Sequence, residues 1–318
     1  MRSSDPAGDY DSPWKEALER YFPLFMAFFF PHAHADIDWS RGYQFLDKEL
    51  QQVVRDAAMG RRVVDKLVKV WRSGGAEAWV LVHVEVQGQV DPDFAQRMYV
   101  YNYRLFDRYQ RQVASLAVLG DPQRDWRPDR FTYALWGSEV SLRFPVVKLL
   151  DYNARWEALE GSGNPFAVLV MAHLKTDATR RDPAARLQWK LRLVKDLYER
   201  GYGREDVLEL FRFIDWMMAL PEELTRQFDD AIEELEEAGK MTYMTKWERR
   251  GRELGFLAAL QEAVVHNLEI RFGVVPNVLR ERVQAVEDIE MLKALHETAV
   301  TAENLDRVQE ALGRSSGE

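Results

Sequence analysis

The 318-residue chain contains no cysteine, which excludes disulfide bonds, thiol catalysis and thiolate zinc sites. The absence of disulfides favours a reducing compartment, and we expect a cytoplasmic protein. The sequence also lacks an excess of basic residues, because 43 Lys and Arg face 52 Asp and Glu for a formal net charge of -9. This balance argues against a uniformly polybasic nucleic-acid binder but leaves room for a local basic groove.

Long hydrophobic runs and several common catalytic motifs are absent as well. The most apolar run, from Phe22 to Pro31, is bounded by prolines and is far shorter than the ~20 residues of a membrane span. No apolar segment follows Arg2, so no signal peptide is expected. No Gly-rich phosphate loop, HExxH pair or nucleophile elbow is present, which disfavours P-loop ATPases, zincins and serine hydrolases.

What is present is an ordinary globular composition, with 47% hydrophobic and 30% charged residues, divided into two unlike halves. Residues 1–150 carry 20 basic and 20 acidic side chains, whereas residues 151–318 carry 23 and 32, so a domain boundary is expected near Asp151. The first half alternates helical and strand patterns, which predicts a mixed α/β or α+β core, and we expect the α/β class. The expected elements are helices at 12–20, 45–57 and 92–108, a β-hairpin at 63–87, a buried strand at 113–120, and strands at 131–137 and 138–147.

The second half shows helical periodicity from Pro183 to about Leu312, broken by glycines and prolines. Within it, Glu222–Glu237 has eight acidic residues and only Arg226 as a base, which is typical of a solvated helix face. This segment should repel DNA. The residues from Trp247 to Leu312 are expected to form a small helical appendage.

Chemistry is most strongly indicated at the end of the apolar strand AWVLVHV, where Glu85 and Gln87 lie two residues apart on one side. A glutamate at the end of a buried strand is costly unless it is paired or binds a metal ion. Asp65 lies on the neighbouring strand of the expected hairpin, so the two carboxylates could converge as a hard-oxygen site for Mg²⁺ or Mn²⁺. The alternative is a polar sheet edge with ordinary hairpin pairing.

Asp65, Glu85 and Gln87 match the spacing of the PD-(D/E)XK phosphodiesterase core, with Gln87 in the lysine position. The stretch HVEVQGQVDPDFAQRMYVYNYRLFDRY resembles the recombination-promoting nuclease family, also called YhgA-like or PD-(D/E)XK-family transposases. The matching residues are Glu85, Gln87, Arg97, Met98 and Tyr101 of its E-x-Q and R-M-x-x-Y patterns, and Asp11, Trp14 and Lys15 of its D-x-x-F/W-K helix. The resemblance implies a nuclease-like domain at 10–152, a helical extension at 153–246 and the appendage at 247–312.

The resemblance also implies roles for single residues. Asp65 and Glu85 would hold the Mg²⁺ or Mn²⁺ ion together with the backbone carbonyl of Val86, and the ion would polarise a scissile phosphate and activate water. Gln87 would orient that water without supplying positive charge. Asp11 or Glu49 is an accessory carboxylate candidate, and Lys15 is a further accessory candidate.

The implied partner is DNA, with no membrane involved and a homo-oligomer left open. Arg97, Tyr101, Arg104 and Arg108 share one face of the 92–108 helix, which predicts either a phosphate-contacting surface or a set of intramolecular ion pairs. The overall expectation is a metal-dependent DNA endonuclease associated with recombination or transposition. The competing interpretation is an inactive DNA- or protein-binding module that retains the nuclease fold.

Overall fold

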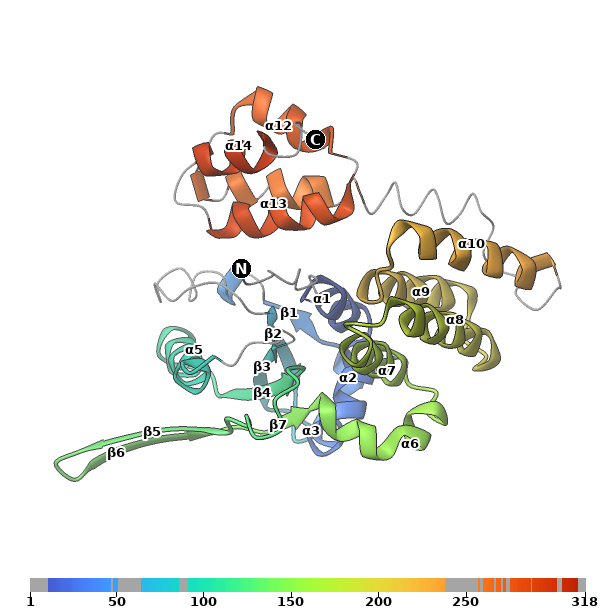
Figure 1. Cartoon of the computed structure of the whole chain (residues 1–318). Helices are drawn as coiled ribbons and strands as arrows, with labels where there is room; N and C mark the ends of the chain where they lie inside the picture. Colours follow the sequence, from blue (N-terminus) through green and yellow to red (C-terminus); the bar gives the residue numbers. More distant parts are fainter. Residues whose placement is uncertain are drawn as a thin grey trace. The chain divides into compact units, whose positions relative to one another are not determined.

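The computed structural model describes residues 11–46, 48–50, 64–85 and 91–237, and near the end of the chain residues 257, 260–265, 267–269, 271–272, 275–286, 288–301 and 305–313. The description covers the backbone alone at residues 11–13, 64, 65, 77, 81–85, 236, 237, 290, 297, 301, 306, 310 and 313. The chain forms two compact units, Met1–Leu235 and Glu236–Glu318. The first unit contains the sheet and the helices that follow it, so the change of charge near Asp151 falls inside one unit (Figure 1).

The helices and strands of the first unit follow one another in a mixed order that confirms the predicted α/β class. They are α1 (Asp11–Arg20), α2 (Phe22–Phe29), α3 (Pro31–Asp36), η1 (Trp39–Arg41), β1 (Gln44–Phe45), β2 (Val64–Trp71), β3 (Glu77–Glu85), α5 (Phe94–Tyr109), β4 (Val113–Leu119), β5 (Arg130–Leu135), β6 (Ser138–Arg143), β7 (Val146–Lys148), η2 (Leu149–Arg155), α6 (Trp156–Glu160), α7 (Pro165–Ala178), α8 (Pro183–Glu199), α9 (Arg204–Met217) and α10 (Glu222–Glu237).

The central sheet has five strands in the order β1-β2-β3-β4-β7. β2 is antiparallel to both of its neighbours, β1 and β3, whereas β3, β4 and β7 are parallel. The predicted hairpin is confirmed as β2–β3, and its turn uses Gly75 at a φ of 83°, a conformation that favours glycine. The carboxyl ends of β3, β4 and β7 therefore meet at one edge of the sheet.

Helices cover both faces of this sheet (Figure 1). On one face, Tyr101 and Leu105 of α5 pack in one cluster with Leu67 and Trp79. Nearer the carboxyl edge, Phe94 and Met98 of α5 pack in a second cluster with residues of β4. Residues alternate between the faces of a strand, so odd positions of β2, β3 and β4 lie on the α5 face.

The opposite face is covered by α1, α2 and α7. Lys66 of β2 is buried there and forms an ion pair with Glu19 of α1. Trp14, Phe25 and Phe166, from α1, α2 and α7 in turn, form an aromatic cluster in which the Phe25 and Phe166 rings lie 5.2 Å apart. These contacts join the helices that follow the sheet to its core.

Two predicted elements differ from the structure. Phe45 was expected in a helix but lies in β1, where it pairs with Val68, and of the predicted 45–57 helix the described part is helical only at Lys48–Leu50. The expected strand at 138–147 is divided at Phe144 and Pro145 into β6 and β7. β5 and β6 form a separate two-stranded sheet instead of joining the central one.

The helices after the sheet have conventional starts and apolar inner faces. Asn164 caps α7 by accepting the Phe166 amide at 2.9 Å, and Asp182 caps α8 by accepting the Ala185 amide at 2.9 Å. The acidic helix α10 is amphipathic, because Phe228 and Ile232 are buried among its charged residues. Among the described residues, no helix is long and apolar enough to cross a membrane.

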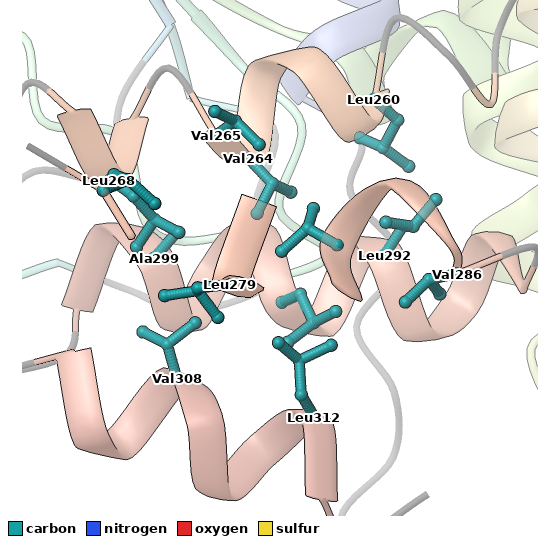
Figure 2. Packing of buried hydrophobic residues seen from close by; sticks show 13 residues of the cluster. Leu260, Val264, Val265, Leu268, Leu279, Val286, Leu292, Ala299, Val308 and Leu312 are labelled. Atoms are coloured by element: carbon teal, nitrogen blue, oxygen red, sulfur yellow. The ribbon is translucent and has the colours of Figure 1, made fainter. Parts of the chain in front are cut away.

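The second unit contains α12 (Asn277–Gln284), α13 (Ile289–Thr301) and α14 (Leu305–Gly313). Its core is aliphatic, with Val264, Leu268, Leu292 and Val308 fully buried (Figure 2). The segment 247–312, predicted as a helical appendage, falls within this unit.

Candidate functional site at the carboxyl edge of the sheet

The register of the β2–β3 hairpin brings positions 65 and 85 to one face of the sheet. Asp65 is paired with His83, and Glu85 is two residues further along β3, so all three positions share that face. Diagonal neighbours of this kind have Cα atoms roughly 7–8 Å apart, with the Cβ atoms somewhat closer. Carboxylates are the hard oxygen donors that Mg²⁺ and Mn²⁺ prefer, and a metal site at these two positions stays a prediction.

The same face is the one covered by α5. Glu85 is paired with Leu119 of β4, and Leu119 packs against Phe94 and Met98 of the helix. Because β3 and β4 are parallel, α5 returns along the sheet in the opposite direction to both strands. The candidate site therefore lies where the first turns of α5 meet the last residues of β3.

The remaining predicted ligands and accessory residues are placed as follows. Val86 and Gln87 lie outside the described residues. Asp11 begins α1, a helix on the opposite face of the sheet, and Lys15 in the same helix is exposed. Glu49 is half-buried in the short Lys48–Leu50 helix. Among the described residues, no three His, Asp or Glu side chains gather as a metal site.

Arg97 and Tyr101 are turned into the core, which corrects their expected place on an exposed phosphate-contacting surface. Arg97 is 7% exposed and forms an ion pair with Asp91, and Tyr101 is 2% exposed in the cluster against Leu67. The ion pair is the intramolecular alternative that the helix pattern left open. Of the predicted DNA-contacting residues, Arg104 remains partly exposed on α5.

The burial of Arg97 has an electrostatic consequence. Arg97 lies one helical turn before Tyr101. It is therefore nearer than Tyr101 to the carboxyl edge of the sheet, where positions 65 and 85 lie. A guanidinium in this place supplies positive charge where solvent is excluded. It also ties Asp91, in the segment that follows β3, to the helix.

A second buried charge pair lies at the same edge, and sequence reasoning missed it. Asp121 lies two residues after the end of β4, and Lys148 is the last residue of β7. Their side chains form an ion pair with 0% exposure on each side. Lys148 also donates to the Trp126 carbonyl at 3.3 Å, and Asp121 accepts the Gln123 amide at 3.0 Å. Burial lowers the pKa of Lys148, and the hydrogen bond to Asp121 opposes that shift.

The position of Lys148 relates the pair to the candidate site. Lys148 is paired with Leu119, which in turn is paired with Glu85, so Lys148 and Glu85 share one face two strands apart. Two inter-strand spacings amount to about 10 Å. The sequence feature that could have indicated this ion pair is Asp121, which follows the apolar run VASLAVLG. Polar residues that follow buried parallel strands often line ligand-binding sites.

His173 of α7 closes the opposite face at this edge. Its Nε2 lies 2.8 Å from the Gly120 carbonyl oxygen, and since a carbonyl can only accept, Nε2 carries the proton. Burial lowers the pKa of His173, and the hydrogen bond to Gly120 opposes the shift. His173 thus holds the chain at the end of β4 as a neutral donor.

The chain matches no family model, no curated protein and no solved structure with which it was compared. The resemblance to the recombination-promoting nuclease family therefore stays a prediction, and the function must be argued from the residues of this chain.

Proposed function

We propose that the chain is a metal-dependent DNA endonuclease of the PD-(D/E)XK class, associated with recombination or transposition. The observation that carries this proposal is the register of the β2–β3 hairpin. In this register positions 65 and 85 lie on adjacent strands and on the same face of the sheet. The proposal is also supported by the mixed α/β core, in which antiparallel strands β2 and β3 are followed by crossover helix α5 and the parallel strand β4.

In the proposed site, Asp65, Glu85 and the Val86 carbonyl hold Mg²⁺ or Mn²⁺. The bound ion supplies Lewis acidity toward a phosphate and lowers the pKa of water. Gln87 orients the attacking water through its amide. Its lack of charge leaves the stabilisation of developing negative charge to other groups, among which we include buried Arg97 on the covering helix.

The DNA would approach the neutral half of the first unit. Arg104 is partly exposed and Arg108 is exposed on α5, close in sequence to the residues that cover the site. The acidic helix α10 would repel a phosphate backbone and so face away from the bound duplex. A cytoplasmic location, expected from the lack of cysteine, completes the proposal.

The test is a plasmid-nicking assay with Mg²⁺, Mn²⁺ and EDTA, run on the wild type and Glu85→Gln. Asp107→Asn is the matched control, because Asp107 is an exposed carboxylate on α5. We expect nicking by the wild type and the control only with a divalent ion, and none by Glu85→Gln. Metal-dependent binding without nicking would favour the inactive binding module, and nicking by Glu85→Gln would contradict the site assignment.

A further inference from the structure

The β5–β6 hairpin presents an unusual amount of apolar surface. The described residues include seven large hydrophobic side chains that are exposed, and Tyr133, Leu135 and Trp136 of this hairpin are three of them. Trp136, at the turn, is 97% exposed. In Figure 1 the hairpin extends away from the central sheet. Such a two-stranded ribbon is only marginally stable by itself.

The hairpin has one apolar and one polar face, which follow from its register. The apolar face carries Phe131, Tyr133, Leu135, Val140 and Leu142, and the polar face carries Arg130, Thr132, Glu139, Ser141 and Arg143. At the base, Phe131 stacks on Tyr99 of α5 with ring centroids 5.0 Å apart. The apolar face is therefore covered near α5 and exposed toward the turn.

The two strands of the hairpin have different neighbours. Neither β5 nor β6 has a third strand on its outer side among the described residues, but α5 packs beside β5. An edge strand of this kind can pair with another chain through its backbone. The side chains of β6 then decide which partner fits.

The charges on β6 are complementary to a second copy of the same strand. Arg143 is directly opposite Arg130 within the hairpin, which is an unfavourable like-charge pair. Its ion pair with Asp129, at 3.6 Å, leaves the Arg143 side chain 72% exposed. Glu139 is exposed on the same polar face, four residues before Arg143.

We infer that β6 is a self-pairing strand through which two copies of this chain form a homodimer. Antiparallel pairing about a two-fold axis at Ser141 places Glu139 opposite the partner's Arg143, twice by symmetry. The same register places Val140 opposite the partner's Leu142, so both apolar faces join into one. Registers centred on Glu139 or Arg143 place like charges opposite each other instead.

A single-cysteine variant tests this register, because the chain has no cysteine of its own. Directly opposite residues in an antiparallel pair have Cα atoms roughly 4.5–5.5 Å apart, and a disulfide spans about 4.4–6.8 Å. Ser141→Cys should therefore give a disulfide-linked dimer on mild oxidation. Ser138→Cys is the control on the same strand, since it is displaced from its own copy by about 20 Å.

Charge reversal gives a second, independent readout by sedimentation of the full chain. Glu139→Arg or Arg143→Glu alone should weaken the dimer roughly tenfold or more, because both cross-strand pairs become repulsive. The variant with both reversals should regain the dimer. A monomeric wild type, crosslinking of Ser138→Cys instead of Ser141→Cys, or a dimer insensitive to either reversal would overturn the inference. It would also be overturned if the hairpin bound single-stranded DNA as a monomer.

Discussion

The buried Asp121–Lys148 pair should contribute strongly to the stability of the first unit. Asp121→Asn leaves the Lys148 ammonium without its counter-charge at a site with 0% exposure. Removing one partner of a buried ion pair costs about 3–5 kcal/mol. For a unit of this size each kcal/mol lowers the melting temperature by roughly 2–4 °C, so we expect a loss of about 6–20 °C.

The matched control is Asp151→Asn, which removes the Arg127–Asp151 ion pair with side chains 45% and 46% exposed. Because exposed pairs contribute roughly 0–1 kcal/mol, this change should be nearly neutral. The double variant Asp121→Asn/Lys148→Met removes both buried charges and should regain most of the stability. Urea unfolding followed by far-UV circular dichroism measures all three variants.

The pH dependence of Asp121→Asn provides a further check. Burial already lowers the pKa of Lys148, and loss of Asp121 removes the main group that opposes the shift. A lysine whose pKa is lower in the folded state makes folding more favourable as pH rises toward its unfolded pKa. The variant should thus recover stability between neutral pH and about pH 10. Equal, small losses of unfolding free energy at neutral pH for Asp121→Asn and Asp151→Asn would refute the reasoning.

Two further predictions concern buried titratable groups. Burial lowers the pKa of His173 in the folded state. Below about pH 6.5 the unfolded state therefore takes up a proton before the folded state does, and the free energy of unfolding of the wild type falls by up to ~1.4 kcal/mol per pH unit. His173→Gln, which still donates to Gly120, should lose less stability between pH 7.5 and 5.5, and parallel unfolding profiles would contradict this. Burial and a hydrogen bond to Asp206 raise the pKa of Tyr21, so above about pH 10 its contribution to stability is lost as pH rises. Tyr21→Phe should be less sensitive to alkali, as unfolding at pH 9 and 11 will show.

Local sequence signals predicted much of the fold. The β2–β3 hairpin follows from β-branched runs around a Gly-Gly turn, and α5 and β4 follow from periodicity and length. Phe45 was predicted wrongly because its strand depends on pairing with Val68, a contact that local periodicity does not encode. Helical periodicity also predicted that Arg97 and Tyr101 lie on one face of their helix, but it could not show that this face packs against the sheet.

The candidate site was only partly predictable for the same physical reason. Asp65 and Glu85 belong to one hairpin, so their common face follows from strand alternation and one turn. Asp121 and Lys148 are 27 residues apart in the chain and meet only because β4 and β7 are parallel neighbours. Such pairing across separate elements is set by tertiary topology.

The central claim is that Asp65 and Glu85 bind a divalent ion, and a thermal scan with Mn²⁺ or EDTA tests it most directly. An ion that binds only the folded state at ~100 times its dissociation constant stabilises it by about 2.7 kcal/mol. The wild type and Asp107→Asn should therefore melt roughly 5–11 °C higher in Mn²⁺ than in EDTA. Glu85→Gln should show no shift, and a shift equal to that of the wild type would contradict the account.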